Sequence, residues 1–153
     1  MAVSSKRSDP AIVRAIRDRL KKSGTVKQMG FTVEEADPGR VLLKMVVKPH
    51  HKQVHGVVHG GVLATLADTA GGMATYSTNL NTPRSATIEM KINFLEAVDE
   101  GTVTAEARVV RRGRHIAVVD CDVRDDHRLV AKALMTFFVG PFSANKTEAR
   151  SRG

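Results

Sequence analysis

Asp68 is the one charged residue in a stretch that is otherwise apolar, small or neutral, residues 60–76 (GGVLATLADTAGGMATY). The stretch is long enough for a helix of about four to five turns, and a helix that is apolar on nearly every face is buried in a core. A carboxylate there is costly unless it is paired or used. Asp68 is therefore the first candidate for chemistry. The alternative is an Asp bonded to neighbouring backbone or to a partner subunit, and the helix pattern alone leaves both open.

His59-Gly60-Gly61 stands at the start of the same helix. The first N–H groups of a helix have no intrahelical partners, and the helix dipole is positive there. Because glycine lets a ligand approach the backbone closely, such an end can stabilise a developing oxyanion. The alternative is that the glycines only allow a tight entry turn, and these three residues alone are a weak signal.

The spacing between Gly60 and Asp68 predicts how the two could act together. Eight residues correspond to about 12 Å along one continuous helix. A catalytic carboxylate and an oxyanion donor must both lie about 3 Å from one reacting group, which a single straight helix cannot arrange. Two such helices packed antiparallel could place both groups at one reacting centre, because the N-terminus of each helix would lie beside the Asp of the other. The geometry therefore predicts a two-fold dimer with two composite sites.

The elements that must position these residues follow from capping, turns and periodicity. Asp9-Pro10 predicts the start of a helix that runs to about Lys22 and ends at Gly24. The turn Asp37-Pro38-Gly39 separates two strands, and period-two alternation predicts four more after the long helix. The six predicted strands span residues 31–36, 40–48, 86–94, 103–109, 115–124 and 129–139.

This order of elements favours an α+β fold in which one antiparallel sheet wraps around one long central helix. The last four strands follow one another with short connections, which predicts an antiparallel meander. An open sheet leaves its edges unpaired, and dimerisation is one way to cover them.

The length of 153 residues predicts one folded domain over residues 25–142. Residues 1–24 form an N-terminal helix and arm, and the polar basic tail 143–153 is expected to be disordered. Cys121 is the single cysteine, so no internal disulfide is possible and a reducing compartment is expected. No apolar signal region precedes the helix, and the apolar stretch is short for a membrane span and carries Asp68. We therefore expect a cytoplasmic protein that does not enter the membrane.

A net charge of +8 is typical of proteins that bind nucleic acid, but here the positive charge is concentrated near the two ends of the sequence. Residues 1–22 carry +5 and residues 143–153 carry +2, so the body is close to neutral. With no Trp and one Tyr there is also no aromatic platform for stacked bases. We expect no binding to nucleic acid.

Four histidines before the long helix raise the question of a metal. His51, His55 and His59 would align if this segment were helical, but Gly56 argues against a rigid helix. No acid or cysteine nearby completes a coordination sphere. We predict no metal site.

The segment VHGVVHGGVLATLADTAGGMA resembles the hotdog-fold acyl-CoA thioesterases of the phenylacetate-pathway (PaaI-like) type. ATIEMKINFLEA resembles the strand that follows the helix in that family, and RRGRHIAVV its basic-Gly-basic segment. The resemblance covers roughly residues 30–140. It implies a hotdog fold, a homodimer often paired into a homotetramer, and hydrolysis of acyl-CoA thioesters.

The resemblance also implies roles for individual residues. Asp68 matches the catalytic acid, which attacks the thioester or activates water, and Gly60 matches the backbone N–H that polarises the carbonyl. His59 matches the motif His that shapes that end of the site. Thr87 matches a Ser/Thr that positions the water or the carboxylate. Gln53 falls where relatives often carry Asn, and its longer side chain puts this contact in doubt.

Substrate contacts are expected at seven further positions, and coenzyme A belongs to the substrate, so no separate cofactor is expected. The arginines of the RRGR turn could hold the CoA phosphates, to which guanidinium groups are suited, unless they form only a solvated turn. The expected substrate-binding residues are Gly61, Glu89, Phe94, Arg111, Arg112, Gly113 and Arg114.

Two other functions compete with acyl-CoA thioesterase. A non-catalytic acyl-CoA-binding or regulatory hotdog module is disfavoured because Asp68 is retained and no DNA-binding helices are attached. A hotdog hydratase or dehydratase would use a catalytic His in other motifs, which the sequence lacks. The sequence does not identify the acyl group.

Overall fold

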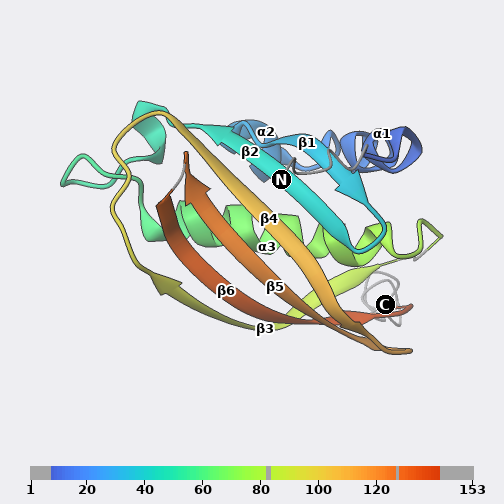
Figure 1. Cartoon of the computed structure of the whole chain (residues 1–153). Helices are drawn as coiled ribbons and strands as arrows, with labels where there is room; N and C mark the ends of the chain where they lie inside the picture. The colour runs from blue at the N-terminus through green and yellow to red at the C-terminus, as the bar shows by residue number, and fades with distance from the viewer. Residues whose placement is uncertain (1–7, 82–83, 127, 142–153) are drawn as a thin grey trace, which may run out of the picture.

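The computed structural model describes residues 8–81, 84–126 and 128–141 (Figure 1). The predicted disordered tail, 143–153, lies outside these residues. The elements are α1 (Pro10–Leu20), α2 (Gly24–Met29), β1 (Thr32–Asp37), β2 (Arg40–Val46), the 3-10 turn η1 (Pro49–His51), α3 (Gly60–Ser77), β3 (Ser85–Phe94), β4 (Thr102–Arg112), β5 (Ile116–Asp125) and β6 (Arg128–Val139).

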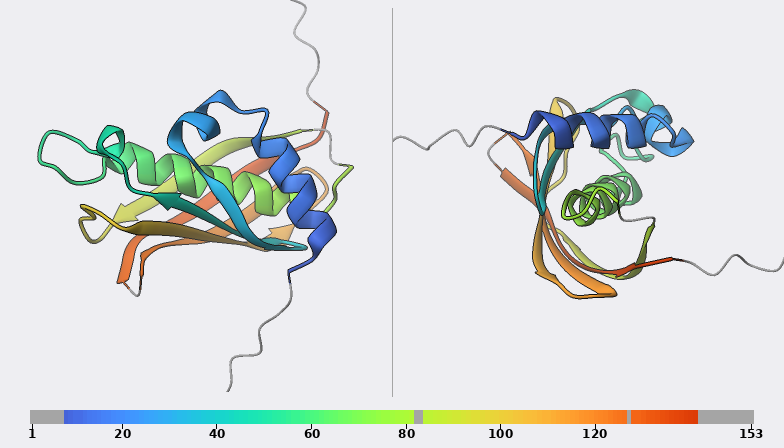
Figure 2. Two further views of the ribbon diagram at one scale, coloured as in Figure 1. Left: turned by 90° about the horizontal axis from the view of Figure 1, so that it is seen from above. Right: turned by 90° about the vertical axis from the view of Figure 1, so that its right-hand side faces the viewer.

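One antiparallel six-stranded sheet, in the order β1-β2-β4-β5-β6-β3, curves around α3 (Figures 1 and 2). The helix contacts all six strands, and α1 packs against β1 and α3. The buried apolar residues lie mainly between α3 and the concave face of the sheet, because alternate residues of the strands point inward. This arrangement confirms the predicted α+β hotdog fold with an extra N-terminal helix.

The predicted four-strand meander is wrong in one respect. β4, β5 and β6 pair in sequence, but β3 pairs with β6 at the far edge, and β4 pairs with β2. α3 fills the concave face between β2 and β3, so the chain leaves the helix at the opposite edge of the sheet. Residues 95–101 then cross back over the end of the sheet, where Val98 is buried.

The N-terminal segment holds two helices where the sequence predicted one. The Asp9 carboxylate accepts hydrogen bonds from Ala11 N–H (2.8 Å) and Ile12 N–H (3.4 Å), so α1 begins where predicted. α1 ends at Leu20, however, and Ser23 caps a second helix by accepting from Val26 N–H at 3.2 Å. Gly24, expected to end the helix, is therefore the first residue of α2.

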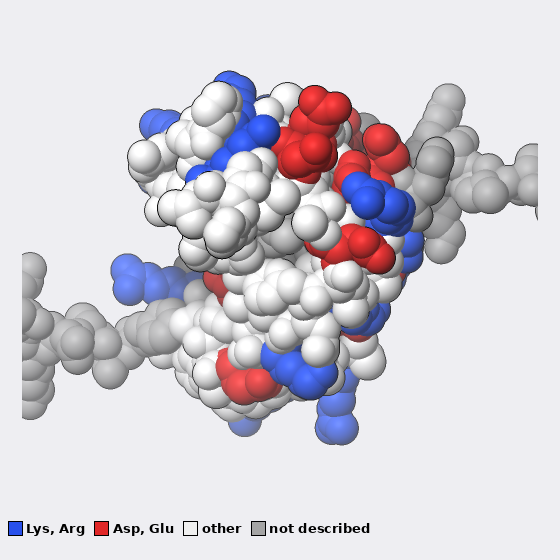
Figure 3. Space-filling view, turned by 90° about the vertical axis from the view of Figure 1, so that its left-hand side faces the viewer, with Lys and Arg blue, Asp and Glu red and all other residues white. Residues whose placement is uncertain are grey.

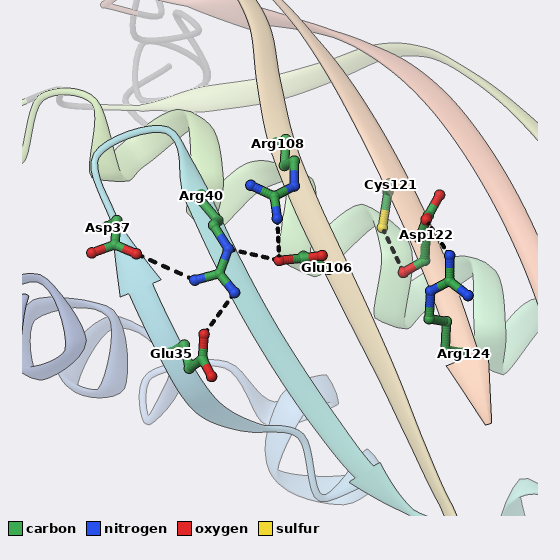
Figure 4. A network of polar contacts seen from close by, with 8 residues as sticks. All are labelled: Glu35, Asp37, Arg40, Glu106, Arg108, Cys121, Asp122 and Arg124. Carbon is green, nitrogen blue, oxygen red and sulfur yellow. Dashed lines mark hydrogen bonds and ion pairs between the residues drawn. The ribbon is translucent and has the colours of Figure 1, made fainter. Parts of the chain in front are cut away.

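The face of the sheet turned away from α3 carries paired charges (Figure 4). Arg40 donates to Glu35 and Glu106 at 2.6 Å each and to Asp37 at 3.2 Å. Burial disfavours the charge of this guanidinium, but the bonds to Glu35 and Glu106 outweigh it and raise the pKa of Arg40 above its usual value. These pairs hold β1, β2 and β4 together on the face that faces solvent.

Cys121 lies on the opposite, inner face of β5 and is fully buried. Burial, followed by the negative charges of Asp122 and Asp120, raises the pKa of its thiol to about 12. A thiol in this state packs in the core and is not activated as a nucleophile.

Figure 3 shows the end of the molecule that carries the loop before α3. On the described residues of this face, basic and acidic side chains are interspersed between larger uncharged areas. Among the helices of the described chain, none combines the length and the hydropathy that crossing a membrane requires.

Candidate active site

α3 is buried on most of its surface, as predicted, but one stripe of it stays open in the single chain. The stripe repeats at helical spacing, and its residues are exposed or half-buried although most of the flanking positions are buried. It consists of Gly61, Thr65, Asp68, Thr69, Met73 and Tyr76. The predicted catalytic carboxylate therefore lies on the one face of α3 that the sheet leaves uncovered.

Thr87 of β3 donates its hydroxyl hydrogen to Asp68 Oδ1 at 2.6 Å. A β-bulge directly after Thr87 changes the register of β3 against β6. Asp68 Oδ2 has no donor within the described part of the chain, so it can accept a hydrogen bond from water. The pair lines a pocket of about 380 Å³, and the sequence correctly placed these two residues together.

The N-terminus of α3 is built from His59, Gly60, Gly61 and Phe94. His59 caps the helix, and its Nδ1 accepts from Gly61 N–H at 2.8 Å, so this nitrogen is unprotonated. Gly60 N–H has no acceptor among the described residues and remains available. The helix end thus presents one free donor beside the Phe94 ring.

Side chains lie close to both glycines, and at Gly61 the contact is too short for any other residue. A Cβ at Gly60 would lie 3.3 Å from the Phe94 ring, and one at Gly61 would lie 2.9 Å from His59 Nδ1. The second contact is shorter than side-chain carbons adopt, so Gly61 is needed for the cap itself. This gives the HGG motif a structural reason beyond the approach of a ligand.

The two halves of the candidate site do not meet within one chain. α3 runs without interruption from Gly60 to Ser77, so Gly60 and Asp68 are about 12 Å apart along its axis. This continuity is the condition on which the predicted composite site depends.

Gln53 and Glu89 are not brought to Asp68. The Gln53 side-chain oxygen accepts from His55 N–H at 2.9 Å and closes a turn in the loop before α3. Glu89 pairs with Thr136 and is exposed, while its neighbour Met90 packs toward the core. Successive strand residues point to opposite faces, so Glu89 faces away from α3.

The arginine turn lies at the other end of α3 from Gly60. Arg112 Nε donates to Thr78 Oγ1, the C-cap residue of α3, at 3.3 Å, and its Nη1 donates to the Gly113 carbonyl. Arg111 and Arg114 are exposed. Arg112 therefore anchors the turn to the helix and leaves the other two arginines free to reach solvent.

The histidines before α3 fasten the loop to α2. His51 is 1% exposed, and its Nδ1 accepts from Lys48 N–H at 3.0 Å. Burial, and then the charge of His50, lowers the pKa of His51. His50 Nε2 lies 3.2 Å from the Gln28 carbonyl. In the described chain no three His, Cys, Asp or Glu side chains group as metal ligands would.

The corner between α1 and α2 lines the pocket of Asp68 and Thr87, which the sequence reasoning missed. Leu20, Ser23 and Val26 come from this corner. Ser23 is a residue type that caps helices, but Val26 stands where a capping box would carry Glu or Gln, so the sequence signal for this corner is weak.

Known proteins show the same architecture. Residues 55–132 match the model of the thioesterase superfamily. Human acyl-coenzyme A thioesterase 13 is 29% identical over 72% of this chain and 80% of its own. A conserved protein of Pseudomonas aeruginosa, PA5202, is 33% identical, with a TM-score of 0.76 over 79% of this chain and 97% of its own.

A thioesterase family protein of Silicibacter pomeroyi is 27% identical, with a TM-score of 0.79 over 86% of this chain and 99% of its own. The matched segment contains the end of the loop from His55 onward, the whole of α3 and the strands that carry Thr87 and the arginine turn. The chain thus belongs to the thioesterase superfamily and is a thioester hydrolase with the hotdog fold.

Proposed function

We propose that this enzyme hydrolyses the thioester bond of acyl-CoA or aryl-CoA at a site shared between two copies of the chain. The main support is the hydrogen bond between Thr87 of β3 and Asp68 on the open stripe of α3. Gly60, whose N–H is unpaired among the described residues, lies on the same continuous helix as Asp68. A second α3 packed antiparallel on this stripe would supply the oxyanion donor that each Asp68 lacks.

In the proposed reaction the thioester carbonyl oxygen accepts from Gly60 N–H of one copy. Asp68 of the other copy, held by Thr87, removes a proton from water, whose oxygen adds to the carbonyl carbon, or attacks that carbon itself. The positive end of α3 stabilises the oxyanion, and its collapse expels the thiolate of CoA. If Asp68 attacks directly, this collapse leaves a mixed anhydride on Asp68, which water then hydrolyses to the free acid and the regenerated carboxylate. His59 contributes by fixing the shape of the helix end.

The exposed edge strand β3 is the surface on which we place the dimer. Ile88 and Phe94 are 57% and 51% exposed, which is unusual for large apolar side chains on a long edge strand. Pairing β3 with β3 of a second copy about a two-fold axis would cover this edge and bring the open stripes of α3 together. A homotetramer of two such dimers follows from the family resemblance.

We assign the CoA phosphates to Arg111 and Arg114, because both guanidinium groups are exposed on a turn that Arg112 anchors to α3. Gly61, Phe94 and the backbone of Gly113 are proposed to contact the substrate. Coenzyme A enters as part of the substrate, so the proposed reaction uses no separate cofactor or metal.

The test measures free-thiol release from aryl-, short-, medium- and long-chain acyl-CoAs by wild type and Asp68→Asn. Loss of a general base or nucleophile typically lowers the rate by about 10²-fold or more. Asp99→Asn is the control, because Asp99 is an exposed carboxylate outside the site. We expect turnover by wild type and Asp99→Asn and a loss of at least about a hundredfold in Asp68→Asn.

Two results would contradict the proposal. Undiminished turnover by Asp68→Asn would remove Asp68 from the mechanism. Tight binding of acyl-CoA by both proteins, without turnover of any thioester, would leave the non-catalytic binding module as the better description.

A further inference from the structure

The pocket that holds Asp68 and Thr87 has a second wall, made by the corner between α1 and α2. Figure 2 shows α1 and β3 on opposite sides of α3. The α1–α2 corner contributes two basic residues, Arg19 and Lys22, to the pocket of about 380 Å³ that also contains the carboxylate. A molecule that reacts at Asp68 and fills this pocket must therefore lie against the N-terminal helices.

Arg19 is a positioned cation. Its guanidinium carbon lies 4.2 Å above the centre of the Tyr76 ring, and Tyr76 belongs to α3, two turns beyond Asp68. A cation–π contact of this kind favours one orientation of the guanidinium and still leaves its N–H groups free to donate. The arginine is thus fixed to the helix that carries the reactive carboxylate.

Arg19 differs from the charged residues of the outer sheet face in lacking a carboxylate. Arg40, Lys44 and Lys132 on that face each lie within 3.2 Å of an acidic side chain. Within the described ranges, neither Arg19 nor Lys22 has an acidic group within ion-pair distance. An uncompensated guanidinium in a partly enclosed pocket attracts an anionic group.

The pocket lining combines apolar side chains with the hydroxyl groups of Ser23, Thr69 and Ser85. Leu20, Val26, Met73 and Phe137 line the same pocket. Its volume of about 380 Å³ lies near the lower end of the range for small-molecule sites, about 300–1,000 Å³. A short hydrocarbon spacer can lie against these apolar residues, and an anionic group is attracted to the part of the pocket that Arg19 and Lys22 line.

We infer that the preferred acyl group is short and carries a carboxylate at its far end, with Arg19 as the specificity residue that binds this carboxylate. The inference rests on the proposed function, because it places the thioester carbon at Asp68. Lys22 lines the same pocket and adds a second positive charge. Hydrolysis would release a dicarboxylic acid and CoA.

The experiment compares glutaryl-CoA with pentanoyl-CoA, the neutral thioester with the same number of carbon atoms. The variant is Arg19→Gln, which removes the charge and keeps a donor. The matched control is Arg17→Gln, because Arg17 is an exposed arginine on the same helix outside this pocket. Thermal unfolding of each variant shows whether α1 is still docked.

Wild type should hydrolyse glutaryl-CoA with a kcat/KM about tenfold or more above that for pentanoyl-CoA, as expected for a charge-assisted hydrogen bond. Arg19→Gln should lose most of this preference, mainly through KM, while its activity on pentanoyl-CoA stays near that of wild type. Arg17→Gln should keep the preference.

Equal losses on both thioesters would overturn the inference. If those losses disappear with thioesters of N-acetylcysteamine, which lack the CoA phosphates, Arg19 binds the nucleotide end instead. A wild type that turns over no thioester would contradict the proposed function. Calorimetric titration would then test the specificity inference by itself. Glutaryl-CoA should still bind about tenfold more tightly than pentanoyl-CoA. Equal affinities for the two thioesters would overturn the inference.

Discussion

Gly60 and Gly61 are adjacent, but different neighbours constrain them. Gly61 leaves room for the His59 ring that accepts its N–H, whereas Gly60 lies under Phe94 with its own N–H unpaired among the described residues. Only the Gly60 donor can therefore be given to a ligand without breaking the N-cap. Within the HGG motif, the Gly61 N–H thus forms the N-cap, and the Gly60 N–H is the one that we propose to bind the substrate.

This separation predicts different results for two substitutions at Gly60. Gly60→Pro removes the N–H. The first position of a helix tolerates proline, and His59 before it has the extended backbone (ψ 134°) that a residue preceding proline prefers. Gly60→Ala adds a Cβ against Phe94 and keeps the donor. Gly60→Pro should lower kcat by about 10²–10³-fold, as for loss of an oxyanion donor, and Gly60→Ala far less.

Steady-state kinetics on the best acyl-CoA measures both, with helix content followed by circular dichroism. If alanine and proline reduce kcat equally, crowding against Phe94 and not the lost donor is responsible.

Some site residues could be found from the sequence because their chemistry is local. Asp68 stands out as a charge on an apolar helix, and His59 with Gly60 marks the start of that helix. The surroundings of Gln53 and Glu89 depend on a turn and on the register of β3 after its bulge, which no spacing in the sequence reveals.

At the scale of elements, α3 packs closely on β6 through Gly71. A Cβ at this position would lie 2.7 Å from Met135 Cε and 3.0 Å from the Phe137 ring. At Gly72 the nearest atom, also of Phe137, would be 3.7 Å away, an ordinary contact. One of two neighbouring glycines is therefore needed for the approach of helix and sheet.

Gly71→Ala and Gly72→Ala form a matched pair for this contact. Alanine gains about 1 kcal/mol over glycine in a helix, whereas overpacking a core typically costs about 1–3 kcal/mol. Gly72→Ala should leave the free energy of unfolding unchanged or raise it. The free energy of unfolding of Gly71→Ala should be lower than that of Gly72→Ala by about 1–3 kcal/mol. Urea unfolding at one protein concentration measures both, and equal stabilities would show that Met135 and Phe137 move aside freely.

Periodicity and turn residues predicted the strands to within a few residues, because apolar and polar residues alternate along them, with the apolar side buried in every strand except β3. They did not predict that β3 pairs with β6, since sheet order depends on how α3 crosses the concave face. α2 was missed because six residues carry too little periodicity, and Gly24 resembles a helix end.

At the scale of the whole molecule, β3 is an edge with exposed apolar side chains, and α3 has an open stripe beside it. Ile88 on β3 is 57% exposed, and Leu134 on the outer face of β6 is 48% exposed. If β3 forms the dimer, Ile88→Lys should yield monomers without thioesterase activity, because a charge would be buried between two edges. Leu134→Lys should leave the dimer and its activity intact.

Sedimentation velocity and thiol release measured on the same samples check this pair. An active dimeric Ile88→Lys variant would show that another surface joins the two copies.

A composite site also predicts that two inactive chains restore each other. In a mixed dimer of Asp68→Asn and Gly60→Pro, one site receives both changes, and the other receives an intact Asp68 from one chain and an intact Gly60 from its partner. With random exchange half of the dimers are mixed, so about a quarter of the wild-type activity should return.

Unmixed samples at the same total concentration set the baseline, and size-exclusion chromatography of differently tagged chains verifies the exchange. If each chain instead used its own Gly60 and Asp68, verified mixed dimers would stay at the baseline. The continuity of α3 from Gly60 to Ser77 is the reason to expect recovery, because no bend brings the two residues of one chain together.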